Sequence, residues 1–376
     1  MVARALVRNG WAASLYSLAG HGPLSAELAK GGVSVFVPPF EPAAQSTWFA
    51  RWGRLAAAAV HLFSVLLYRR PSIVHFFLPH AYLVGAPAAL LARRPIRVMS
   101  RRSLNVYQAK HRILSVVERR LHRLMTAVLG NSRSVIRELK DEEGVPDRRL
   151  ALIYNGIDCD RFSGSGARHA VRGVPTIENS ALTLVIVANL IEYKGHLDLV
   201  EALGEAAPQM PVGWRLLVVG RDDGLGPAVK ARAAEVGIAA NIALLGPRND
   251  VPDLLQTCDI GLLCSHEEGF SNSVLEAMAA GLPMVVTDVG GNAEAVVDGK
   301  TGLVVPPRHP ERLSGAILQL AHDPALRARM SVAARARVRE HFSLEQCVAG
   351  YERLYRTLLA GGAPSDAARI KVSGGE

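Results

Sequence analysis

Two carboxylates eight positions apart, Glu268 and Glu276, flank a loop of small and polar residues that runs into an apolar helical stretch. The apolar run at 259–264 predicts a buried strand, so the segment indicates strand, loop and helix. Open α/β sheets bind ligands beyond the carboxyl ends of their strands, and the free N–H groups of a helix N-terminus suit a phosphate. We therefore expect an anionic ligand that carries hydroxyls, with one carboxylate on each side.

A cation follows a second predicted strand, at 183–188. This is Lys194, which stands before Gly195, His196 and a helical run. A lysine in a strand-end loop is usually only solvated. The Lys-Gly-His context at the start of a helix favours a functional role, in which the ammonium group meets the anionic part of the ligand.

Five further motifs occur in a fixed order along the chain. They are Asn155-Gly156-Ile157-Asp158 with Arg161-Phe162; Asn189-Leu190 with Lys194-Gly195-His196; Val218-Val219-Gly220; Leu245-Gly246 with Asp250-Val251-Pro252; and Gly290-Gly291-Asn292-Ala293-Glu294 with Asp298-Gly299-Lys300-Thr301-Gly302. With the two glutamates, they make the chain resemble the retaining glycosyltransferases of family 4 over nearly its whole length.

The resemblance implies an α/β protein with the GT-B fold, in which two Rossmann-like parallel-sheet domains face a cleft and a C-terminal helix crosses back to the first domain. Residues 1–165 would form the acceptor-side domain and 166–343 the donor-binding domain, of the type called glycosyl transferases group 1. Residues 344–360 would be the crossover helix and 361–376 a disordered tail.

In this family Glu268 would contact the transferred hexose and Lys194 the donor diphosphate, as the catalytic pair. Other donor contacts are implied at Asn189, Gly220, Gly269, Phe270, Ser271, Asn272, Ser273 and Glu276. Of these, Glu276 would hold the ribose hydroxyls and Ser271 would cap the helix. Relatives commonly have an arginine where this chain has Asn189, so phosphate neutralisation would depend more on Lys194 and the helix end.

Acceptor-side candidates follow strand ends in the first half. Arg101 and Arg102 come after a predicted strand at 96–99 and suggest a phosphate-binding pair within the cleft. His80 follows another strand, at 72–77, and is an acceptor-site candidate, whereas His75 is more often structural. No Asp-x-Asp follows a strand, so we expect no metal and no other cofactor, with the nucleotide sugar bound as a substrate.

The composition is that of a folded protein with two domains. Of 376 residues 49% are apolar and 20% charged, which excludes a disordered chain. The cysteines Cys159, Cys258, Cys264 and Cys347 lack metal-type spacing and read as reduced core thiols. No convincing membrane span or signal peptide appears, which favours a cytoplasmic protein, with a peripheral position on the inner face of the plasma membrane as a refinement.

The charge is uneven along the chain. Residues 1–165 hold 23 Lys/Arg against 10 Asp/Glu, a net charge of +13, whereas the remainder holds 20 against 24, a net charge of −4. The basic half favours an anionic membrane surface or lipid phosphate as partner; an arginine-rich surface with no partner is the equal alternative. Nucleic acid is not expected, because the basic residues lack aromatic interleaving.

Strand-like runs alternate with amphipathic helical runs throughout, which predicts parallel α/β architecture. The expected strands lie near 12–17, 33–37, 72–77, 96–99, 126–130, 150–154, 183–188, 215–219, 242–245, 259–263, 284–287 and 303–305. The polar stretch from 163 to about 180 predicts an interdomain linker. Residues 1–10 read as the end of a helix. Relatives precede this helix with a strand and a glycine-rich loop, so we expect a start codon placed too late rather than a true truncation.

Together these features predict a retaining, metal-independent enzyme that moves a hexose from a nucleotide-diphosphate sugar to a glycan or lipid-linked acceptor, in cell-surface polysaccharide synthesis. Two alternatives stay open. One is a catalytically inactive sugar-nucleotide binder or partner protein, suggested by Asn189 and the unusual start. The other is a Rossmann oxidoreductase, which the lack of Gly-x-Gly-x-x-Gly after a first strand disfavours.

Overall fold

The computed structural model describes residues 1–40, 48–105, 112–162 and 182–367. The chain divides into two compact units, one comprising Met1–Tyr154 with Leu344–Glu376 and the other Asn155–Ser343. The segment 155–162 thus lies in the second unit, whereas residues 1–165 were predicted to form the first domain. The predicted linker, from 163 to about 180, lies outside the described residues.

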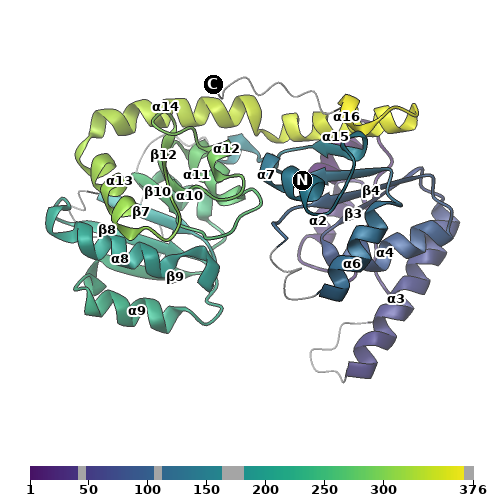
Figure 1. The fold of residues 1–376 in the computed structure, drawn as a ribbon, viewed down its shortest axis with the longest axis horizontal. Helices are drawn as coiled ribbons and strands as arrows, with labels where there is room; N and C mark the ends of the chain where they lie inside the picture. The colour runs from purple at the N-terminus through teal and green to yellow at the C-terminus, as the bar shows by residue number, and fades with distance from the viewer. Residues whose placement is uncertain (41–47, 106–111, 163–181, 368–376) are drawn as a thin grey trace. The chain divides into compact units, whose positions relative to one another are not determined.

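The second unit is built on a six-stranded parallel sheet (Figure 1). Its strands are β7 (Leu182–Val187), β8 (Trp214–Val219), β9 (Ile242–Gly246), β10 (Ile260–Leu263), β11 (Met284–Thr287) and β12 (Gly302–Val305). In space they run β12-β11-β10-β7-β8-β9, so β7 pairs with β8 on one side and with β10 on the other. Both faces of such a sheet are covered by helices, which explains why its strands read as nearly continuous apolar runs.

Seven helices accompany this sheet among the described residues. They are α8 (His196–Ala206), α9 (Gly226–Glu235), α10 (Val251–Gln256), α11 (Asn272–Ala280), α12 (Asn292–Ala295), α13 (Pro310–His322) and α14 (Pro324–His341), with 3-10 turns η2 (Cys159–Phe162), η3 (Glu192–Lys194), η4 (Ala207–Gln209) and η5 (Ala239–Asn241). Helix α8 packs against both α9 and α13, and α11 packs against α14.

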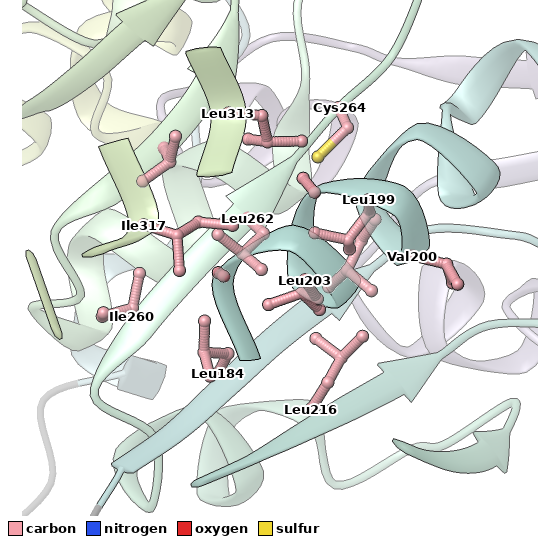
Figure 2. Packing of buried hydrophobic residues seen from close by; sticks show 14 of the residues in the cluster. Leu184, Leu199, Val200, Leu203, Leu216, Ile260, Leu262, Cys264, Leu313 and Ile317 are labelled. Atoms are coloured by element: carbon pink, nitrogen blue, oxygen red, sulfur yellow. The ribbon is translucent and has the colours of Figure 1, made fainter. Parts of the chain in front are cut away.

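A close-packed apolar core fixes the strands that carry the loops of interest. Figure 2 shows Leu199 and Leu203 of α8 beside residues of β7, β8 and β10, with Leu313 and Ile317 of α13 closing the cluster. Leu203 and Ile317 have no exposed surface. Because such interiors pack as densely as organic crystals, the carboxyl ends of β7 and β10 are held rigidly.

The first unit contains two parallel sheets. Strands β1 (Ser14–Tyr16) and β2 (Ser34–Phe36) form one; β3 (Ile73–Phe77), β4 (Ile96–Arg101), β5 (Ala127–Gly130) and β6 (Leu150–Leu152) form the other in that order. The helices are α1 (Val2–Arg8), α2 (Ser25–Lys30), α3 (Trp48–Arg69), α4 (Pro79–Leu91), α6 (Arg112–His122) and α7 (Arg133–Asp141), with the 3-10 turn η1 (Asp147–Arg149). All twelve strands lie close to their predicted positions.

The predicted terminal helix is α15 (Leu344–Leu359), and it belongs to the first unit. Its buried Tyr351 and Leu354 join a core with residues of β4, β5 and β6. The Tyr355 hydroxyl lies 2.7 Å from His75 Nδ1, and His75 Nε2 lies 2.7 Å from the Ser100 hydroxyl. Burial, with the nearby charge of Arg102, lowers the pKa of His75 to about 3, so the ring is neutral and structural.

The C-terminal tail is partly ordered, contrary to the prediction for 361–376. Residues Pro364–Ala367 form a short helix, α16, whose Pro364 is buried and which packs near β6 and η1. The proline favours a helical first turn, a signal that the glycine-rich composition around it concealed. The remainder, 368–376, lies outside the described residues.

Two composition-based predictions can be compared with the structure. All four cysteines are buried and free, which confirms them as core thiols. Within the described parts of the chain, no helix combines the length and the apolar character that crossing a bilayer requires.

Candidate active site

The candidate site lies at the carboxyl ends of β7 and β10. These strands are hydrogen-bonded neighbours, with Ile186 opposite Leu262, so the loops that follow them emerge side by side. The chain leaves β7 toward β8 on one side, while β10 lies on the other. This change of direction is where open α/β sheets form a ligand-binding crevice.

Lys194 and Glu268 meet across these two loops. The ammonium group of Lys194 donates directly to Glu268 Oε1, and the exposed fractions of the two side chains are 17% and 11%. The buried Ser265 hydroxyl donates to the same oxygen over 3.1 Å. Glu268 Oε2 has no donor among the residues that the structure describes. One carboxylate oxygen is therefore held by the protein and the other is available to a ligand hydroxyl.

Two glycines allow the loops to approach this closely. A Cβ atom on Gly195 would lie 1.9 Å from the Cys264 carbonyl oxygen, and Gly195 adopts a left-handed φ of 70°. A Cβ atom on Gly290 would lie 1.6 Å from the Glu268 carbonyl oxygen. A side chain at Gly195 would collide with the Cys264 backbone, and one at Gly290 would collide with the Glu268 backbone, so either would displace the loop that carries Glu268.

Helix α11 begins directly after the Glu268 loop. Ser271 occupies the N-cap position, as predicted, but its hydroxyl does not cap the helix; it lies 3.0 Å from the Ser273 hydroxyl instead. The Asn272 side chain is exposed at this end. The first-turn N–H groups of a helix have no intrahelical acceptor, so Asn272 and Ser273 present donors where an anion would be stabilised by the helix dipole.

Glu276 lies on α11 more than one turn after the N-terminus and is partly buried. Burial raises the pKa of its carboxyl, and the opposing charge of Arg161 in η2 limits the rise. No hydrogen-bond partner for this carboxylate occurs among the described residues. A partly desolvated acceptor of this kind suits a ligand hydroxyl pair.

Asn189 and Gly220 lie at the ends of β7 and β8. The Asn189 side-chain oxygen accepts from the Arg221 N–H over 3.1 Å, so it holds the β8 loop. A Cβ atom on Gly220 would lie 2.1 Å from the Ala188 carbonyl oxygen, which explains the glycine by backbone contact alone. The predicted ligand roles of both stay predictions.

His196 follows Gly195 as the first residue of α8 and is only 2% exposed. Burial lowers the pKa of the ring to about 4, with Lys194 adding to the effect and the nearby Ala188 backbone opposing it. Neither ring nitrogen has a hydrogen-bond partner of good geometry among the described residues. The ring is therefore neutral, and we assign it to the packing beneath Lys194.

Of the acceptor-side candidates, Arg101 is not available to a ligand, which corrects the prediction. It is 1% exposed, and its guanidinium donates to both oxygens of Glu143, over 2.9 and 3.1 Å, and to Glu118. Glu143 also meets His122 Nε2 at 2.8 Å. Burial raises the pKa of Glu143, but His122 and Arg101 more than offset this, so its carboxyl stays ionised. Arg101 is thus the centre of a buried ion network.

The other two acceptor-side candidates remain accessible. His80 is exposed near the start of α4, and Arg102 is partly buried after the end of β4. Both belong to the first unit, at the carboxyl ends of β3 and β4. Their roles stay predictions.

Two sequence families match the chain, one for each unit. The family described as Glycosyltransferase Family 4 matches residues 1–161, and the family described as Glycosyl transferases group 1 matches residues 168–337. The chain belongs to the family 4 glycosyltransferases.

This glycosyltransferase is similar to curated proteins of several bacteria. It is 29% identical over 296 residues to a glycogen synthase of Mycobacterium tuberculosis, which covers 76% of this chain and 69% of that protein. It is 27% identical over 293 residues to an N-acetyl-alpha-D-glucosaminyl L-malate synthase of Bacillus anthracis, covering 76% and 74%.

The fold of this glycosyltransferase is GT-B. A crystal structure of Anabaena Alr3699/HepE in complex with UDP-glucose matches it with a TM-score of 0.79 and 22% sequence identity, over 96% of this chain and 94% of that one. At this identity the likeness supports the shared fold only.

Several side chains that shape the site in this glycosyltransferase were missed from the sequence. Besides Ser265, they include His266. Its ring nitrogen Nε2 lies 2.8 Å from an Asp198 carboxylate oxygen on α8, and its backbone N–H donates to the Tyr193 carbonyl. The Thr287 hydroxyl donates to the Ser265 carbonyl over 2.6 Å. The polar pair Ser265-His266 directly after an apolar run is a signal that could have found the first two.

Proposed function

We propose that this glycosyltransferase moves a hexose from a nucleotide-diphosphate sugar to a glycan or lipid-linked acceptor, with retention of anomeric configuration, in cell-surface polysaccharide synthesis. The observation that carries the proposal is the Lys194–Glu268 pair beside the N-terminus of α11. This arrangement offers a cation and helix N–H groups to a diphosphate, and a carboxylate to the sugar hydroxyls.

In the proposed reaction the bond between the anomeric carbon and the diphosphate oxygen breaks, and the acceptor hydroxyl oxygen bonds to that carbon. The acceptor proton passes to the leaving diphosphate on the same face of the sugar. Lys194 and the first turn of α11 stabilise the charge that develops on the leaving oxygen. The proposal requires no metal, because these cationic and dipolar groups already offset that charge.

Glu276 provides the test of donor binding. Glu276→Ala is expected to weaken binding of the nucleotide by about 1–3 kcal/mol, because it removes the acceptor proposed for the ribose hydroxyls. A thermal-shift panel of UDP-, GDP- and ADP-sugars would identify the donor, and calorimetry would compare the variant with wild type. Glu205→Ala, a change at an exposed glutamate of the same unit, is the control. Equal affinity for wild type and Glu276→Ala would exclude the ribose role.

We also propose that the first unit associates peripherally with anionic membranes through helix α6. Ile113, Val116 and Val117 are 81%, 50% and 40% exposed, and they share one helix face at i, i+3 and i+4. Arg119 and Arg120 are also exposed on α6. Apolar side chains beside arginines are typical of helices that lie in the membrane interface. The +13 charge of residues 1–165 supports the same partner.

Vesicle sedimentation tests this association. Wild type should bind vesicles containing phosphatidylglycerol and bind more weakly in high salt, since surface charges are screened beyond about 8–10 Å near physiological ionic strength. Ile113→Ser with Val117→Ser should reduce binding. Val332→Ser, which alters an exposed valine of α14, should leave it unchanged. Binding that ignores lipid charge, or no binding, would favour a soluble acceptor.

A further inference from the structure

Asn155 contacts the loop between β10 and α11, although it lies far from that loop along the chain. It is the first residue of the second unit and is 6% exposed. Its side-chain amide nitrogen donates to the Phe270 carbonyl oxygen over 3.0 Å and to the Asn272 side-chain oxygen over 2.8 Å. The two N–H groups of this buried amide thus each donate a hydrogen bond to an acceptor at the start of α11.

These two acceptors flank the backbone that would receive the diphosphate. Phe270 and Asn272 lie on either side of the N-cap residue Ser271, whose own hydroxyl does not cap the helix. The Phe270 ring is also buried, 5.3 Å from the Phe342 ring. The direction of the first-turn N–H groups is therefore set in part from outside the helix.

The remainder of the loop is anchored at other points. The Thr287 hydroxyl holds the Ser265 carbonyl, and the Gly291 N–H donates to the Gly269 carbonyl over 3.0 Å. These contacts fix the beginning and the middle of the segment, whereas Asn155 fixes its junction with α11. A loop held in its binding conformation loses less entropy when its ligand binds.

We propose that Asn155 is a positioning residue for the donor diphosphate. By holding the Phe270 carbonyl and the Asn272 side chain, it keeps the N–H groups of the first turn of α11 directed at the phosphates. This inference rests on the donor site of the proposed function and adds to it a residue whose effect is specific to the charged part of the donor.

The side-chain chemistry predicts different effects for two substitutions of Asn155. Asn155→Ala removes both donors. Asn155→Asp keeps the size but replaces the donor with an oxygen that faces two acceptors, and it adds a negative charge beside the anion site. Asp should therefore be worse than Ala for a diphosphate, although it preserves the volume better.

The experiment is calorimetry of UDP, GDP and ADP, and of the corresponding uncharged nucleosides, on the full chain. For the preferred nucleotide, Asn155→Ala should weaken diphosphate binding roughly 10-fold, the size expected for losing one or two hydrogen bonds, and Asn155→Asp should weaken it further. Nucleoside binding should change little. Asn241→Ala is the matched control, because that amide donates to the Trp214 carbonyl near the start of β8, away from the loop.

Binding by the Asn155 variants and by Lys194→Ala distinguishes a wrong role for Asn155 from a wrong donor site. The positioning role is wrong if both Asn155 variants keep the wild-type affinity for the diphosphate, or if they lose affinity for nucleoside and diphosphate equally. The donor site would still stand in that case if Lys194→Ala weakened diphosphate binding. If Lys194→Ala also bound normally, the proposed donor site would fail. Should the Asn155 variants unfold, Asn272→Ala removes the acceptor of one bond at an exposed position. It is expected to show a smaller loss of the same selective kind, and unchanged diphosphate affinity in it would overturn the inference.

Discussion

Replacing Lys194 with alanine is expected to weaken nucleoside-diphosphate binding by about 2–3 kcal/mol, or roughly 30- to 150-fold. Lys194 is the cation at the junction of the β7 and β10 loops, and Asn189 provides no charge there. Charge-assisted bonds to phosphate are about twice as strong as neutral ones, so the remaining helix N–H groups cannot replace it.

Calorimetry with UDP, GDP and ADP measures this loss. Lys194→Arg, which keeps the charge on a bulkier group, should retain part of the affinity. Lys230→Ala makes the same truncation at an exposed lysine of α9 and should bind as wild type does. Wild-type affinity in Lys194→Ala would show that the ammonium group serves Glu268 only, and the proposed donor site would then be wrong.

Glu268→Gln is expected to reduce sugar transfer by roughly 10²- to 10³-fold, the range found when one electrostatic group of an active site is removed. The same change should leave nucleoside-diphosphate affinity unchanged or increased. Glutamine cannot form the ion pair, so Lys194 no longer has to leave a carboxylate partner in order to meet the phosphates. The two members of one ion pair thus have different effects on nucleotide affinity.

Steady-state transfer assays and nucleotide calorimetry on the same variant separate these effects. Glu267→Gln is the neighbouring control, because that side chain has no ion-pair partner among the described residues and no assigned role. A parallel fall in transfer and in diphosphate affinity for Glu268→Gln would make Glu268 a nucleotide or structural group.

The strands and their loops were predictable because apolar runs and punctuating glycines are local signals. The partnership of Lys194 with Glu268 was not, since it depends on β7 lying beside β10. Strand order is a property of the whole sheet and leaves no period in the sequence. The same holds for Asn155, which reads locally as a turn residue but binds a loop 115 positions away.

For Arg101, the position was predicted correctly but the surrounding charges were not. Its place at the end of β4 was predictable, and a strand-end arginine suggests an anion site. Its environment is set by Glu118 on α6 and by Glu143 beyond α7, which converge on it only in the folded unit. Periodicity locates a residue along a strand, but it does not show which distant charges will surround the side chain.

The most direct test of the central claim is proton NMR of the sugar product formed from the donor that the thermal-shift panel identifies, in the presence of EDTA. We predict release of the nucleoside diphosphate together with a first-formed product that has the same anomeric configuration as the donor, and strong loss of both signals in Glu268→Gln. A product with the inverted anomeric configuration would contradict the account. So would a wild-type protein that binds the donor but releases no nucleoside diphosphate when the matching acceptor is present.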